Sequence, residues 1–107
     1  MPVIPPNRLG NGLMAATPTI AYTGTERYTK ISFLTACNIG GSQETVIVLI
    51  TPNGGTARRV TRFVLEANET ALVFSEKEPA VLGPGDSMSL QATNGASVAY
   101  YMGGEIA

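Results

Sequence analysis

The sequence contains no histidine, which removes the commonest general base and the commonest metal ligand together. It also lacks a GxSxG motif, a P-loop and a dinucleotide-binding fingerprint. Its carboxylates do not form a cluster like that of an EF-hand loop. We therefore predict that the protein is not an enzyme, with no catalytic residues, no cofactor-binding or metal-binding residues and no small-molecule substrate.

Charged residues are scarce, at 14% of the chain against about a quarter in an average protein. The seven basic and eight acidic residues leave a net charge of −1 without a basic face or stripe, so no nucleic-acid partner is expected. Two explanations for the low charge stay open. The surface of a small domain is covered by Thr, Ser, Asn and Gly, or part of it is covered by other subunits, because interface cores are depleted of charge.

A single cysteine, Cys37, excludes an internal disulfide. It lies in an apolar strand pattern, which predicts a small buried hydrophobic side chain rather than a nucleophile. A lone thiol also fits a reducing cytoplasm. The sequence shows neither a signal peptide nor an apolar run of membrane-spanning length, so we expect a soluble protein made inside the cell, without a membrane partner.

Apolar and polar residues alternate with a period of two along most of the chain, which is typical of half-buried strands. The expected strands cover residues 19–23, 28–38, 45–51, 57–66, 69–75, 87–93 and 97–102. Turn signals recur roughly every 8–12 residues, as in sandwiches and jelly rolls. The 107 residues therefore predict an all-β fold, with a single antiparallel β-sandwich or jelly-roll domain over residues 13–107.

The turns between these strands carry two strong signals. Asn94-Gly95 is typical of a type I′ turn, so residues 87–93 and 97–102 are expected to pair as a hairpin. Residues 83–86 (GPGD) lead into a strand rather than a helix, so we interpret them as a turn whose aspartate binds backbone amides, not as a phosphate loop.

Alternation also predicts which side chains share a face. Ile31, Phe33 and Cys37 should share one face of their strand, and both Leu72 and Phe74 should point inward. On residues 57–66 the pattern sets one group of side chains, Arg58, Val60, Arg62 and Val64, against another, Thr61, Phe63 and Leu65. Residues 45–51 are apolar on both faces, which predicts a central strand whose outer face is covered by the N-terminal segment or by a partner.

Residues 1–12 (MPVIPPNRLGNG) hold three of the seven prolines and cannot form a helix or a central strand. We predict an extended N-terminal arm that lies along its own domain or reaches onto a neighbour. Its apolar residues Val3, Ile4 and Leu9 are candidate partner contacts.

Two further groups are candidate interface residues. The only basic cluster, Arg58, Arg59 and Arg62, either contacts an acidic surface or nucleic acid, or forms the solvated face of an edge strand. Tyr100 and Tyr101 are adjacent in a strand and must point to opposite faces. One ring should lie in the core, and the other is available as a surface or interface anchor.

Short motifs at the start, middle and end of the chain share the pattern of a known family. They comprise Arg8-Leu9-Gly10-Asn11-Gly12 after the Pro/Gly-rich arm, Tyr22-Thr23, Ile31-Ser32-Phe33-Leu34 through Cys37-Asn38, Val81-Leu82, Pro84-Gly85-Asp86-Ser87, Gln91 and Gly104-Glu105. In these motifs, which span almost the whole chain, the sequence resembles the small all-β virion proteins of tailed bacteriophages. The motifs are turn and packing positions rather than chemical groups.

This resemblance implies a non-enzymatic structural protein of the virion that is assembled in the host cytoplasm. The leading expectation is a capsid decoration (cement) protein that forms a homo-oligomer and binds other virion proteins, the major capsid protein above all. A neck, collar, tail or fibre component is the nearest alternative. A receptor- or carbohydrate-binding module is a further one, although the loops hold mainly Gly, Asn, Pro and Ser.

Overall fold

The computed structural model describes residues 7–24, 27–75, 77–94 and 97–106, and these residues form strands and turns without a helix. The strands are β1 (Asn7–Leu13), β2 (Thr19–Thr23), β3 (Thr29–Asn38), β4 (Glu44–Thr51), β5 (Arg58–Leu65), β6 (Thr70–Phe74), β7 (Ala80–Leu82), β8 (Ser87–Ala92) and β9 (Val98–Ile106). All strand pairs are antiparallel. The all-β prediction is confirmed.

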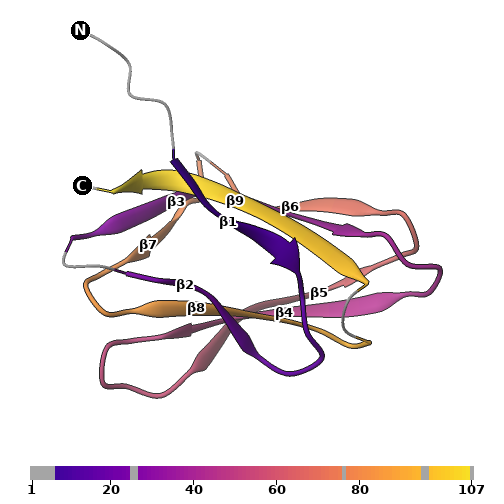
Figure 1. The fold of residues 1–107 in the computed structure, drawn as a ribbon, viewed down its shortest axis with the longest axis horizontal. Helices are drawn as coiled ribbons and strands as arrows, with labels where there is room; N and C mark the ends of the chain where they lie inside the picture. The colour runs from indigo at the N-terminus through magenta and orange to yellow at the C-terminus, as the bar shows by residue number, and fades with distance from the viewer. Residues whose placement is uncertain (1–6, 25–26, 76, 95–96, 107) are drawn as a thin grey trace, which may run out of the picture.

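The strands form two sheets that lie one above the other in Figure 1. The first sheet has the order β1-β9-β3-β6, and β7 pairs with the same edge of β3 as β6 does. The second sheet has the order β2-β8-β4-β5. Strands β1 and β2 are therefore edge strands of their sheets, as are β6 and β5.

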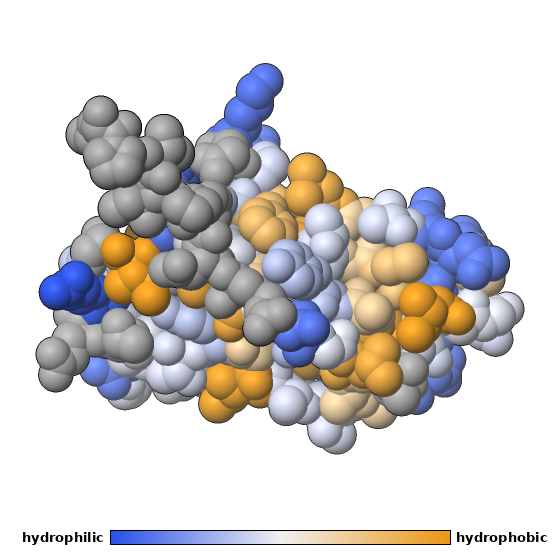
Figure 2. Space-filling model, turned by 45° about the horizontal axis from the view of Figure 1, so that its top comes forward, coloured by the Kyte–Doolittle hydropathy of each residue, from blue (hydrophilic) through white to orange (hydrophobic). Residues whose placement is uncertain are grey.

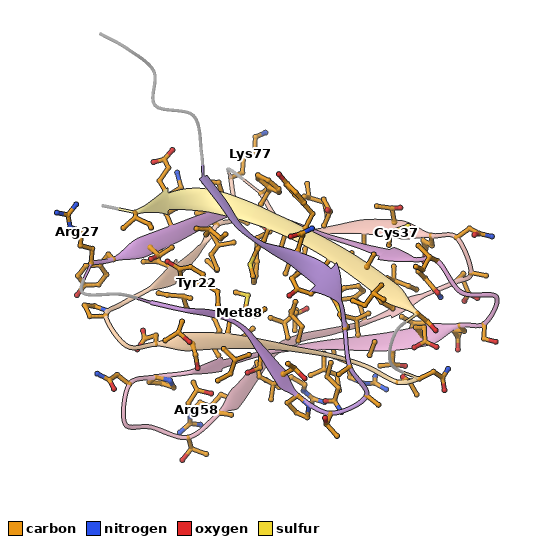
Figure 3. All side chains as sticks on the ribbon, in the orientation of Figure 1. Tyr22, Arg27, Cys37, Arg58, Lys77 and Met88 are labelled. Carbon is orange, nitrogen blue, oxygen red and sulfur yellow. The ribbon has the colours of Figure 1, made fainter. Side chains whose placement is uncertain are left out.

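A single apolar cluster fills the space between the sheets. Its fully buried members come from both sheets and from the segment after β1: Met14, Ile31, Leu34, Ala36, Val46, Val48, Leu65, Ala80, Leu82, Met88, Leu90, Ala92, Val98 and Met102. Figure 3 shows Tyr22 and Met88 in this space. Burial of this apolar surface is the main force that holds the two sheets together.

A β-bulge in β3 corrects the predicted faces of that strand. The register with β9 shifts between Ile31 and Phe33, so one residue is added to the alternation. Ile31 and Leu34 are consequently both buried, whereas Phe33 and Cys37 are only partly buried on the outer face. The prediction that Cys37 is a buried core residue is therefore wrong, as is its placement on one face with Ile31.

Bulges also correct the faces of β5 and β6. The register between β3 and β6 shifts between Leu34 and Thr35, which turns Leu72 outward, 60% exposed, while Phe74 packs against the core. In β5, Val60 is the extra residue, because Thr61 pairs with Val48 but Arg59 pairs with Leu49. Arg59 therefore joins the face of Arg62, and Arg58 moves to the other side of the strand. The predicted face of Arg58 is wrong.

The predicted hairpin around Asn94 is also wrong. Both strands exist, but β8 pairs with β2 and β4 in the second sheet, and β9 pairs with β1 and β3 in the first. The connection between them therefore crosses from one sheet to the other. Asn94 does not have the positive φ that a type I′ turn requires, since Asn68 is the non-glycine residue with positive φ in the described part. Gly95 lies outside the described residues.

The predicted turn at residues 83–86 is confirmed. Gly85 has a φ of 81°, and the amide of Asp86 donates to the carbonyl of Gly83 at 3.1 Å, as in a type II turn. The Asp86 carboxylate accepts hydrogen bonds from the amide of Gly83 at 2.8 Å and from the amide of Asn53 at 2.8 Å. Asp86 thus joins its own turn to the turn that follows β4.

Replacing Asp86 with alanine is expected to lower the free energy of unfolding by about 2 kcal/mol, because two backbone amides lose a charge-assisted hydrogen bond. Urea denaturation followed by circular dichroism measures this loss. The Asp86→Asn variant keeps one acceptor oxygen and should lie between alanine and wild type. If Asp86→Ala had the same free energy of unfolding as wild type, the carboxylate would not stabilise the two turns as described.

The predicted N-terminal arm falls partly on the sheet. Residues 1–6, with Val3 and Ile4, lie outside the described residues. Asn7–Leu13 forms β1, which pairs with β9 at the edge of the first sheet. This segment is thus an edge strand along its own domain, not a central one, and Leu9 packs against the core instead of being free for a partner.

Candidate functional site

The described residues contain no group of three or more Cys, Asp or Glu side chains that could hold a metal ion. Within the same residues, no helix is long and apolar enough to cross a membrane. The candidate sites are the surfaces that the strands present.

The twin tyrosines of β9 divide between core and surface. Tyr100 is half-buried and packs against the core, beside the glycines of β1. Tyr101 is 44% exposed, and its ring stacks on Phe33 of β3 with centroids 5.6 Å apart and an interplanar angle of 14°. The prediction that one ring belongs to the core is confirmed. A partner contact for Tyr101 stays a prediction.

Around Tyr101, the outer face of the first sheet is uncharged. Tyr101 is paired with Asn11 of β1 and with Thr35 of β3, and Thr35 is paired in turn with Leu72 of β6. Leu72 and Leu13, at the two edges of the sheet, are 60% and 53% exposed. Figure 2 looks obliquely onto this side, where apolar patches alternate with polar residues. Aromatic and aliphatic side chains on an uncharged face are typical of protein contact surfaces.

The basic cluster lies on β5, an edge strand of the second sheet, so the predicted edge position is confirmed. Arg58, Arg59 and Arg62 are exposed and make no hydrogen bond or ion pair with the residues that the structure describes. Figure 3 shows Arg58 at the start of β5, beside the loop that follows β4. These guanidinium groups are available to a partner, and contact with one stays a prediction.

The predicted central position of the apolar strand is confirmed, because β4 lies between β8 and β5. Its outward residues Ile47 and Leu49 are half-buried. Strand β1 does not cover them, because it belongs to the first sheet. Residues 7–13 of the N-terminal segment therefore do not cover this face, and residues 1–6 lie outside the described residues.

Sequence reasoning missed a groove between the edge strands β5 and β6. Its volume is about 360 Å³, and both polar and apolar residues form its walls. The lining residues are Thr61, Phe63, Val64, Leu65, Glu69, Thr70, Ala71, Leu72 and Val73. Periodicity places each of these strands in a sheet but does not show that the two edges lie side by side, so no local signal could have found the groove.

A buried carboxylate was also missed. Glu44, the first residue of β4, is 1% exposed. Its carboxylate accepts hydrogen bonds from the backbone amide of Asn94 at 2.9 Å and from the Asn94 side-chain amide. The pair fixes the end of β8 against the start of β4. Glu44 does not line the groove between β5 and β6, and its bonds to Asn94 indicate a structural role.

The chain matches no protein-family model, and no curated protein matches it. The class defined by the fold is an all-β protein with two antiparallel sheets.

Proposed function

We propose that the protein is a non-enzymatic structural component of a tailed-phage virion, and that it acts as a capsid decoration protein. The observation that carries the proposal is the uncharged part of the outer face of the first sheet, where Tyr101 stacks on Phe33 between exposed leucines. Lys30 and Glu105 are paired further along the same face. Such a face suits burial against a neighbouring subunit. The resemblance of the sequence motifs to small virion proteins favours a phage particle as the assembly that this face would contact.

The detailed fold is part of the same proposal. Two antiparallel sheets around one core support a β-sandwich. The chain changes sheets at most of its connections, including those from β1 to β2 and from β8 to β9, which supports jelly-roll connectivity. Residues 1–6 precede β1, and in this proposal they form the part of the arm that contacts a capsid or sister subunit through main-chain pairing.

Removal of residues 2–6 is expected to leave a folded protein that decorates capsids poorly. This deletion stops before Asn7, because a longer one would remove β1 from its pairing with β9. The assay adds purified protein to particles of the encoding phage that lack this gene product, and cryo-electron microscopy measures the occupancy. A same-length variant with Val3→Ser and Ile4→Ser should behave like the deletion, since it removes only the apolar contacts.

Wild-type occupancy by the shortened protein would contradict the role of the arm. The location of full-length protein in the same maps distinguishes the two virion roles. A decoration protein covers the shell in many copies, whereas a neck component forms a ring at one vertex. A map with density at the neck alone would replace decoration by the neck role.

A binding module for carbohydrate is a second candidate, favoured by one observation. Tyr28, just before β3, is 62% exposed, so one loop presents an aromatic ring. Aromatic rings are suitable platforms for sugars, but this ring lacks a second one beside it among the described contacts. Binding on a glycan array that is lost in Tyr28→Ala would favour this candidate over decoration.

A further inference from the structure

Strand β5 presents an unusual sequence at a free edge. Within the described part of the molecule, β5 pairs only with β4, so its other edge has no strand partner. The last four residues of the strand and the next one read Arg62-Phe63-Val64-Leu65-Glu66. The segment is basic at one end, acidic at the other and apolar between, so it is complementary to its own reverse.

The faces of these residues follow from their neighbours on β4. Arg62 is paired with Ile47 and Val64 with Thr45, both on the outer face of the second sheet. The Gln43 side-chain amide donates to Glu66 Oε1 at 2.7 Å, which places Glu66 one step further along the same face. The alternate residues Phe63 and Leu65 face inward and line the groove between β5 and β6.

From this arrangement we infer that two copies of the chain associate edge to edge through β5, antiparallel and related by a two-fold axis at Val64. Arg62 of each copy then lies opposite Glu66 of the other, and the two Val64 side chains meet at the axis. The main-chain amide and carbonyl of Glu66 are bonded to Glu69 in the turn after β5, so Glu66 takes part through its side chain. Phe63 of each copy lies opposite Leu65 of the other. A two-fold interface of this kind is self-complementary by symmetry. Directly opposite side chains of an antiparallel pair share a face and contact each other.

The outward side chains in this register, those of Arg62, Val64 and Glu66, are available for the contacts. Arg62 has no partner within the described residues, and Glu66 Oε2 has none either, because its bond to Gln43 uses Oε1. Val64 is 44% exposed in the single chain. On the inward face, Phe63 is only partly buried and adds apolar contact, whereas Leu65 is 1% exposed and stays in the core of its own chain.

The bulge at Val60 is consistent with this register. Bulges and charged residues commonly protect free edges from indiscriminate pairing. Here the bulge, with Arg58 and Arg59 before it, lies outside residues 62–66. It therefore limits the paired segment to the part of β5 whose sequence is self-complementary. The inference concerns the isolated chain and goes beyond the proposed role in a virion.

Charge-reversal variants of the full-length protein test this interface. Sedimentation equilibrium at protein concentrations up to about 1 mM measures the dissociation constant of the dimer. Wild type should dimerise. Arg62→Glu and Glu66→Arg should each raise the dissociation constant at least about tenfold, since each puts like charges opposite each other at two symmetric positions. The double variant should restore dimerisation, because both pairs re-form with inverted polarity. Arg58→Glu makes the same charge change outside the paired segment, and its dissociation constant should stay within about threefold of the wild-type value.

Several results would overturn the inference. These are a monomeric wild type at the highest concentration, unchanged association of either single variant, failure of the folded double variant to dimerise, and an equal effect of Arg58→Glu. Circular dichroism checks that every variant is folded. Val64→Lys gives an independent route should a charge reversal unfold the chain, because it places two lysines together at the axis and should abolish the dimer. The measurement needs no capsid, so its outcome is separable from that of the decoration assay.

Discussion

Replacement of Gly104 with alanine is expected to destabilise the protein by about 4 kcal/mol or more, enough to unfold many small domains. Gly104 lies in β9 opposite Ile31 of β3. A Cβ at this position would collide with the carbonyl oxygen of Lys30, and it would lie 2.9 Å from the carbonyl carbon of the same residue. Both atoms belong to the backbone, so relief requires the two central strands of the first sheet to separate.

Thermal and urea denaturation, followed by circular dichroism, measure this loss. Gly41→Ala is the matched control, because a Cβ at Gly41 meets nothing within 4 Å and the substitution should change stability by no more than about 0.5 kcal/mol. An unchanged denaturation midpoint for Gly104→Ala would show that β3 and β9 do not approach each other as closely as described.

Removal of the buried carboxylate in Glu44→Ala is expected to cost about 3 kcal/mol. The substitution leaves the backbone amide and the side-chain amide of Asn94 without their acceptor and opens a cavity between β4 and β8. Asn94→Ala should cost less, about 1–2 kcal/mol, because the bond from the backbone amide remains.

A double-mutant cycle of Glu44→Ala and Asn94→Ala isolates their interaction. We expect a coupling free energy of about 1 kcal/mol or more, since the two side chains share a buried hydrogen bond. Gln43→Ala serves as the control, because Gln43 makes a comparable bond to a carboxylate at an exposed position. Strictly additive effects of the two substitutions would contradict the proposed link between β4 and the end of β8.

Alternation predicted seven of the nine strands that the structure describes, because each of them has one face on the core, but β1 and the three-residue β7 were missed. It did not predict side-chain orientation beyond a bulge. Phe33, Leu72 and Arg58 were each assigned to a face by uninterrupted alternation, and each lies beyond a register shift. A bulge adds one residue without a compositional signature, so every later side chain in that strand changes face.

The prediction of a hairpin around Asn94 was wrong for a different reason. Asn-Gly is a signal for local pairing, but β8 and β9 each find partners far away in the sequence, and Asn94 instead binds the buried Glu44. Tertiary contacts thus override the local preference. By contrast, the turn at Gly83–Asp86 was predictable because its geometry depends on its own proline, glycine and aspartate.

The candidate surfaces were predicted in the same uneven way. The division of Tyr100 from Tyr101 follows from strand geometry alone and was correct. The exposure of the arginines on an edge strand was also correct. The groove between β5 and β6 and the self-complementary register of β5 depend on which edges are free, and that depends on sheet order, which the sequence does not reveal.

The position of β9 between β1 and β3 also constrains how the chain folds during synthesis. Strand β1 has no partner in its sheet other than β9, so it remains unpaired until residues 98–106 have left the ribosome. The loop that must close between these strands includes nearly the whole chain, and non-local pairing of this kind is slow. The nascent chain therefore exposes free strand edges for most of its synthesis, a period in which chaperone binding would protect it from aggregation.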